Sequence, residues 1–147
     1  VPVIGSAFPN LCLPGDWWQR MIYLGVLSLI GKGLIQLTLV IPGIAGASYG
    51  IRSYVIGFIH LVLLGAVTFG LGGTGLKEGW LPTSRATKIG WTLIAIGFVT
   101  SEILLLGQGT LVWMSLGPIP QYNLMLLIAS ATMPFGLVFL VLGKGKE

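Results

Sequence analysis

Charged residues are scarce in this sequence. Only 8% of the 147 residues are charged, and the mean hydropathy is +0.94. A soluble domain carries about 25% charged residues because its surface must face water. Uncharged apolar runs of about 20 residues, by contrast, are long enough to cross a hydrocarbon core of roughly 30 Å as helices. The composition therefore excludes an ordinary soluble domain and predicts an integral membrane protein.

Cysteine and histidine each occur once, as Cys12 and His60. A single cysteine cannot close a disulfide within the chain and provides no paired ligands for a metal. The sequence also lacks the motifs of phosphate-binding loops, serine hydrolases, zinc proteases and calcium-binding loops. We therefore expect no metal site, no catalytic residue and no enzyme activity of the chain alone, although it can belong to an enzyme complex.

Four apolar runs are separated by stretches rich in glycine and proline, as turns require. The runs cover about residues 17–41, 53–72, 89–113 and 122–142, and the connections are "PGIAGASYGIR", "GTGLKEGWLPTSRATK" and "SLGPIPQ". In a bilayer such runs must be helices, because each backbone polar group needs a partner within its own segment. We expect an all-α, integral membrane four-helix bundle that forms a single domain over residues 1–147. Residues 1–16 are expected to lie along the membrane interface.

The basic residues are distributed unevenly between the two ends of these predicted helices. With four spans, both termini share a side with the loop between the second and third spans. That side carries six basic residues: Arg20, Lys77, Arg85, Lys88, Lys144 and Lys146. The opposite side carries only Arg52. The positive-inside rule therefore places both termini in the cytoplasm, for a protein of the bacterial inner membrane. Topology accounts for the net charge of +4, so no nucleic-acid partner is expected.

Three of the predicted helices each carry one ionisable residue inside an apolar run, namely Lys32, His60 and Glu102. A charge at the bilayer centre costs about 2.5 to 3.5 kcal/mol even on the insertion scale. We therefore expect these side chains to face protein.

Polar and small residues accompany the ionisable ones at helical spacing. Ser28, Lys32 and Gln36 follow one another at intervals of four and form one polar stripe. Ala95 and Gly109 lie on the same face as Glu102, where small residues let another helix approach closely. This pattern predicts helix contacts around the ionisable groups.

Each ionisable residue also has a purely structural interpretation. Lys32 can extend its side chain to the interface, pair with Glu102 or a partner subunit, or take part in a proton relay. Glu102 can stay protonated and donate a hydrogen bond to a backbone carbonyl, and His60 can be a neutral, hydrogen-bonded interior histidine. The sequence leaves these alternatives open.

The stretch "RSYVIGFIHLVLLGAVTFGLGG", residues 52–73, resembles a histidine-bearing helix of haem–copper oxidase-like membrane proteins. In those proteins an H-L-x-L-L-G run is followed by small and hydroxyl residues. The resemblance implies that His60 is an axial ligand of haem, a role that neutral imidazole commonly fills. A haem–copper catalytic centre needs several histidines, however, and this chain has one. By itself it therefore cannot be the catalytic subunit.

The sequence thus predicts a non-catalytic, small integral membrane subunit of a larger respiratory or other electron-transfer complex. Its partners would be the lipid bilayer and larger membrane subunits, and it would require no cofactor. Three alternatives stay open. One is a haem- or pigment-binding electron-transfer protein that uses His60. Another is a small transporter or proton-conducting protein that uses Lys32, His60 and Glu102, and the third is an assembly protein without a cofactor.

Overall fold

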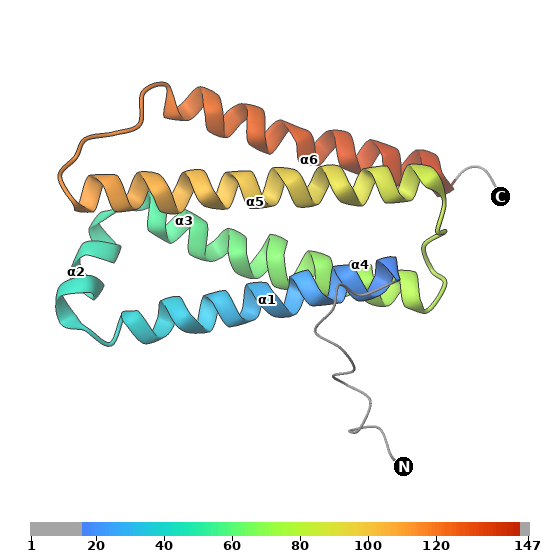
Figure 1. Ribbon diagram of the computed structural model, residues 1–147, viewed down its shortest axis with the longest axis horizontal. Coiled ribbons are helices and arrows are strands. Elements are labelled where there is room, and N and C mark those ends of the chain that lie inside the picture. Colours follow the sequence, from blue (N-terminus) through green and yellow to red (C-terminus); the bar gives the residue numbers. More distant parts are fainter. Residues whose placement is uncertain (1–15, 145–147) are drawn as a thin grey trace, which may run out of the picture.

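The computed structural model describes residues 16–144, and within this range the chain is helical, without strands (Figure 1). The predicted interfacial segment 1–16 lies outside the described residues, apart from Asp16. The elements in order are α1 (Trp17–Thr38), α2 (Pro42–Gly50), α3 (Arg52–His60), η1 (Leu61–Thr68), α4 (Phe69–Lys77), α5 (Arg85–Trp113) and α6 (Tyr122–Lys144). Of these, α3, η1 and α4 follow one another without a break, and η1 is π-helical.

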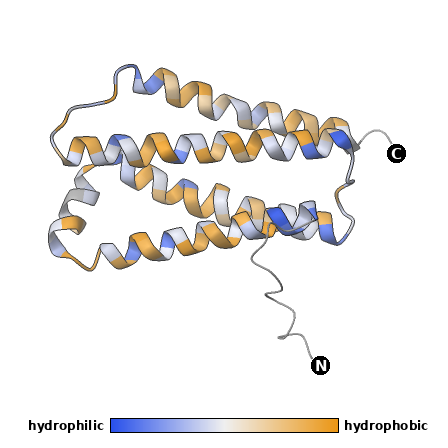
Figure 2. Cartoon of the chain, viewed as in Figure 1, coloured by the Kyte–Doolittle hydropathy of each residue, from blue (hydrophilic) through white to orange (hydrophobic). Residues whose placement is uncertain are grey.

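Four helices among the described residues are long and apolar enough to cross a membrane. They are Trp17–Thr38, Arg52–Lys77, Arg85–Trp113 and Tyr122–Gly143. Apolar residues run along all of them in Figure 2. The predicted class of an all-helical, multi-pass membrane protein agrees with this architecture.

The helix ends differ from the predicted ends for local reasons. α1 ends at Thr38, and the chain then tightens into i→i+3 hydrogen bonds up to Ile41. Pro42 follows and opens α2, because proline is well suited to the first position of a helix. The stretch 42–50, expected as part of a turn, is therefore helical. At the other end, the second span continues to Lys77 rather than residue 72.

The helices alternate in direction, so the start of α1, the α4–α5 connection and the end of α6 lie at one end of the molecule (Figure 1). Lys77, Arg85 and Lys88 are near this end. Arg52 begins α3 at the opposite end, beside α2. The structure thus separates the basic residues as the sequence predicts, and it places the beginning and the end of the helical array together.

α5 is the central helix of the array. α6 packs along one side of it and α3 along another, while α1 packs on η1 and α4. An aromatic cluster fills the space between α4 and α5, with the Phe69 ring centroid 6.0 Å from Trp91 and 5.5 Å from Phe98. Gly72 lies directly against the Trp91 ring, where a Cβ atom would collide with it. This cluster fixes how the second span meets α5 and so positions the polar residues further along both helices.

Candidate intramembrane proton site

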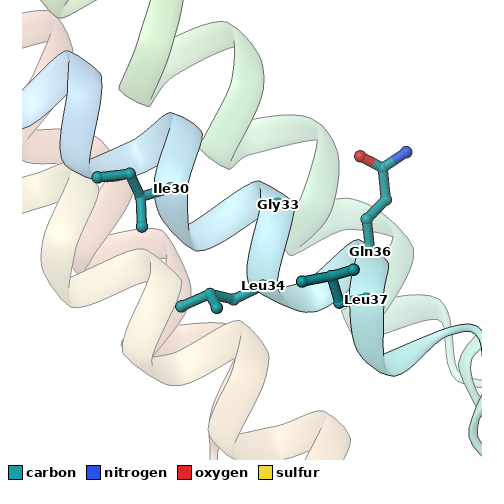
Figure 3. A pocket seen from close by; sticks show the side chains of 5 residues that line it. All are labelled: Ile30, Gly33, Leu34, Gln36 and Leu37. Atoms are coloured by element: carbon teal, nitrogen blue, oxygen red, sulfur yellow. The ribbon is translucent and has the colours of Figure 1, made fainter.

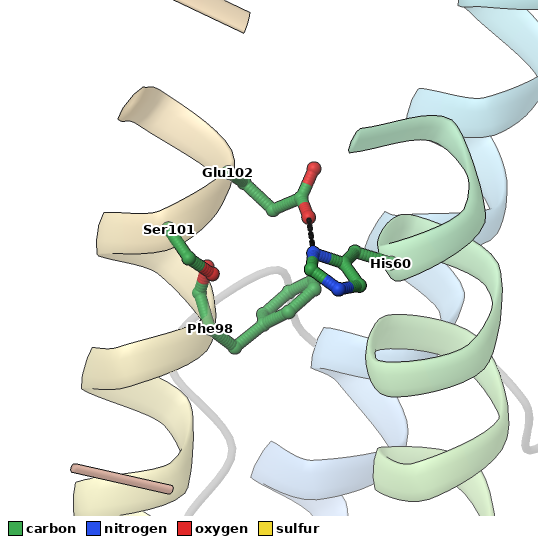
Figure 4. A network of polar contacts seen from close by, with 4 residues as sticks. All are labelled: His60, Phe98, Ser101 and Glu102. Atoms are coloured by element: carbon green, nitrogen blue, oxygen red, sulfur yellow. Dashed lines mark hydrogen bonds and ion pairs between the residues drawn. The ribbon is translucent and has the colours of Figure 1, made fainter. Parts of the chain in front are cut away.

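His60 and Glu102 lie close together between α3 and α5 (Figure 4). Nδ1 of His60 is 3.8 Å from Oε1 of Glu102. Glu102 is buried, with 7% of its surface exposed, whereas about a third of the His60 side chain, 35%, is exposed. The expectation that Glu102 faces protein therefore agrees with the structure. His60 lies at the edge of the helix interface.

Glycines on both helices bring the pair together. Gly57, one turn before His60, faces α5, and a Cβ atom there would lie 3.6 Å from Oε2 of Glu102. Gly109, on the predicted face of Glu102, packs directly against the Tyr54 ring. The Tyr54 hydroxyl donates a hydrogen bond of 3.1 Å to Oγ1 of Thr110. α3 is therefore held close enough to α5 for an imidazole and a carboxyl group to meet.

The pair is poorly satisfied within the described residues. Nδ1 of His60 and both carboxyl oxygens of Glu102 are buried and have no hydrogen-bond partner there. The separation of 3.8 Å exceeds the usual 2.7 to 3.2 Å of a hydrogen bond from a nitrogen donor, and a small side-chain rotation would bring the two groups into hydrogen-bonding distance. Leaving such groups unpaired costs about 1 to 3 kcal/mol each, and unsatisfied buried groups in native proteins call for an explanation such as a functional role.

The backbone changes its winding next to the pair. α3 ends at His60, and the π-helical η1 begins at Leu61. A π-helical turn is wider than an α-helical turn and often occurs at functional sites. In Figure 4, Nδ1 of His60 points toward Glu102, and the second ring nitrogen points away from it. One nitrogen therefore faces the carboxyl group without a hydrogen bond to it, and the other points away from the pair.

Ser101 and Gln108 lie near the pair on α5 but are already hydrogen-bonded. The Ser101 hydroxyl donates to the carbonyl of Phe98 at 2.8 Å. Oε1 of Gln108 accepts a hydrogen bond of 2.8 Å from the backbone N–H of Ile119, in the connection to α6. Gln108 was not predicted as a site residue, although it lies two turns after Ser101 on the same face of the third apolar run.

Lys32 does not join the pair. Its Nζ lies 5.9 Å from the centroid of the Phe58 ring, on α3, within range of a cation–π interaction. Within the described residues, Glu102 faces His60 and forms no ion pair with Lys32, so the Lys32–Glu102 pair considered from the sequence is absent there. The proposed group of three ionisable residues therefore divides into a pair and a separate lysine.

The predicted polar stripe of α1 spans three environments. Ser28 is buried beside Gly65, and its hydroxyl donates to the carbonyl of Leu24 at 2.8 Å. Lys32 is half-buried, and Gln36 is exposed. The stripe divides because α1 buries residues against η1 and α4 only along its first part, at Met21, Gly25 and Ser28.

Among residues 16–144, no three His, Cys, Asp or Glu side chains gather where they could hold a metal ion. Comparison of the chain with protein-family models, with curated proteins and with solved structures yields no match. The resemblance of residues 52–73 to an oxidase helix therefore stays a prediction.

Proposed function

We propose that this chain is a small multi-pass membrane protein that exchanges protons at His60 and Glu102, and so conducts protons or couples their movement to another process. The observation that carries the proposal is the unsatisfied contact of 3.8 Å between an imidazole and a buried carboxyl group on two apolar helices. Ionisable residues within membrane spans are costly and commonly mark ion or proton pathways.

The chemistry of the pair is a reversible proton transfer. A protonated Glu102 carboxyl gives its proton to Nδ1 of neutral His60, which produces a carboxylate and an imidazolium ion. The two opposite charges stabilise each other in the low-dielectric interior. The reverse transfer restores the neutral pair. The second ring nitrogen of His60, which points away from Glu102, can release a proton to another acceptor.

The position of the pair along its helices suits this role. His60 follows Arg52 by eight residues, or about 12 Å at the helical rise. Glu102 precedes Trp113 by eleven residues, or about 16 Å. Both groups therefore fall near the middle of a hydrocarbon core of roughly 30 Å, where a proton crossing the membrane most needs a carrier.

Proton flux into liposomes tests the proposal. We expect the purified protein to acidify a dye-loaded liposome under an imposed potential, and Glu102→Gln or His60→Gln to reduce the rate about tenfold or more, because transfer loses one of its two groups. Lys32→Met and the loop variant Glu78→Gln serve as matched controls and keep the rate. Equal flux in all variants, or no flux in the native protein, would contradict the proposal.

A second candidate is a non-catalytic subunit of a larger electron-transfer complex that holds a haem through His60. The observation in its favour is the orientation of the ring, since ligating histidines commonly turn their other nitrogen toward a carboxylate. His60 would provide one axial ligand, and a partner subunit the second. The haem would supply one-electron chemistry.

Purification from the native membrane distinguishes the two candidates. The haem candidate predicts larger subunits in constant ratio and a Soret absorption band that His60→Ala removes while Glu102→Gln only shifts it. A pure protein without this band that still conducts protons would reject the haem candidate.

For either candidate, the excess of basic residues at one end supports cytoplasmic termini and, in a bacterium, insertion in the inner membrane.

A further inference from the structure

The start of α1 and the end of α4 carry two tryptophan–cation pairs. Nζ of Lys77, on α4, lies 5.8 Å from the centroid of the Trp18 ring on α1. Within α1, Cζ of Arg20 lies 5.6 Å from the centroid of the Trp17 ring. Both distances are within range of a cation–π interaction. Because Trp18 and Lys77 belong to different helices, their contact holds an ammonium group at the junction of α1 and α4.

A glycine brings the two helices together at this junction. Gly73 lies one turn before Lys77, and a Cβ atom there would come within 3.0 Å of the carbonyl oxygen of Trp18. α4 therefore approaches the backbone of α1 closely, and Lys77 follows on the same face one turn later. Helix packing thus determines where the ammonium group lies.

The chain turns sharply after α4 and exposes Trp80. Gly79 has a φ of 76°, and the backbone N–H of Trp80 donates to the carbonyl of Gly75 at 2.9 Å, which is the hydrogen bond of a Schellman motif. Leu81 packs on Gly75, whereas the Trp80 side chain is 72% exposed. An exposed tryptophan at the end of a membrane span is typical of the headgroup layer. The turn therefore places an indole ring in that layer, three residues after Lys77.

This end of the molecule has an excess of positive charge. Its five basic and two acidic residues are Arg20, Lys77, Arg85, Lys88 and Lys144, and Asp16 and Glu78. Lys77 is exposed, and among residues 16–144 its ammonium group forms neither an ion pair nor a hydrogen bond. An ammonium group has three donors, which here are available to an acceptor outside the chain. A ligand at this junction is therefore expected to be an anion with several oxygen acceptors.

The outer surface of α1 toward its other end is of a different kind. A hollow there is lined by Ile30, Gly33, Leu34, Gln36 and Leu37, none of which is charged (Figure 3). Such a surface suits acyl chains. The one cation on this part of α1, Lys32, is turned to Phe58. α1 thus offers positive charge to a headgroup only near its start.

We propose that the junction of α1 and α4 binds the headgroup of an anionic phospholipid. The ammonium group of Lys77, held beside Trp18, donates hydrogen bonds to the phosphate oxygens. Trp80 lies at the level of the glycerol and ester groups, and Arg20 adds positive charge. Basic sites between membrane helices are known to bind anionic headgroups in this way. The site is separate from the proton site, so either can exist without the other.

Native mass spectrometry of the full chain in detergent micelles measures the binding of single lipids. Phosphatidylglycerol should bind at least fivefold more tightly than phosphatidylcholine, because the choline group cancels the charge of the phosphate. Lys77→Gln should raise the dissociation constant of phosphatidylglycerol about fivefold, the contribution of one basic residue at an anionic lipid surface. Lys77→Arg keeps the charge and the cation–π contact, and should keep the affinity.

Matched controls separate this site from a general attraction between basic residues and anionic lipids. Lys88→Gln removes a positive charge at the same end and Arg52→Gln one at the opposite end, and both should change the dissociation constant less than twofold. Trp18→Leu should weaken binding, while Trp113→Leu, which is 51% exposed at the far end of α5, should not. Circular dichroism confirms that each variant is folded. Equal affinity for the two lipids, or equal losses for Lys77→Gln and Lys88→Gln, would refute the site.

Discussion

At the scale of single residues, the buried carboxyl group of Glu102 lowers the stability of the fold, and it is also a group that can carry a proton. Its carboxyl group is buried beside His60, yet neither oxygen has a hydrogen-bond partner within the described residues. A protein selected for stability alone would place an apolar side chain here. Residues that break a local rule in this way are concentrated at functional sites, which is why we regard Glu102 as the centre of the candidate site.

Glu102→Leu should therefore stabilise the protein while abolishing proton flux. Leucine fills a similar space and removes an unsatisfied buried group, whose burial costs about 1 to 3 kcal/mol. Thermal unfolding in detergent micelles, followed by circular dichroism, measures the change in melting temperature. The exposed Glu78→Gln variant should shift it little, because surface substitutions usually change stability by less than about 0.5 kcal/mol. A lower melting temperature for Glu102→Leu would show that the carboxyl group stabilises the fold.

At the scale of elements, α5 joins the other helices by two different kinds of contact. Toward α6 the contact is a close approach of backbones, since a Cβ atom at Gly90 or Gly136 would lie 2.7 Å from the carbonyl oxygen of the other glycine. Toward α4 the contact is aromatic, through Phe69, Trp91 and Phe98. Close backbone approach is intolerant of added volume, whereas aromatic side chains can adjust.

Gly136→Val should accordingly destabilise the α5–α6 pair. The added side chain forces the helices apart, and overpacking of this kind costs about 1 to 3 kcal/mol. Phe135→Val, at the neighbouring position, which is 65% exposed, is the matched control and should have little effect. Fluorescence energy transfer between labels at the ends of α5 and α6 reports the separation, and unfolding reports the loss of stability. A stable Gly136→Val protein with unchanged transfer would contradict the close packing.

At the scale of the whole molecule, the charge distribution and the alternating helices define two unlike ends. One end carries the connection 78–84 between basic residues on α4 and α5, and the other carries α2. Insertion in the membrane follows the basic residues.

Accessibility labelling of single cysteines tests this orientation in intact cells. With Cys12→Ser as background, a membrane-impermeant reagent added outside should modify Tyr49→Cys, because Tyr49 is 85% exposed on α2. It should miss Thr83→Cys, in the connection between α4 and α5, until the cells are opened. Labelling of Thr83→Cys alone in intact cells would show that the orientation is the reverse of the predicted one.

The length and hydropathy of the apolar runs were enough to predict the fold class, and turn-forming residues separated the helices. These features are local, because a helix in a membrane satisfies its backbone within its own segment. For the same reason His60, Lys32 and Glu102 could be recognised as candidates from their apolar surroundings alone. Two local features were still missed: the short helix α2, hidden in a stretch rich in glycine, and the π-helical η1.

Which side chains meet was decided only by the tertiary structure. Helices that are apolar all round give little periodic signal for the face that packs, so Lys32, His60 and Glu102 looked equivalent in the sequence. The rotation of each helix about its axis depends on contacts between distant residues, such as Gly72 with Trp91 and Gly109 with Tyr54. Those contacts turn His60 toward Glu102, and the packing of Ser28 on α1 against Gly65 places Lys32 beside Phe58. The sequence by itself thus identified the ionisable residues as site candidates, and helix packing decided which of them pair.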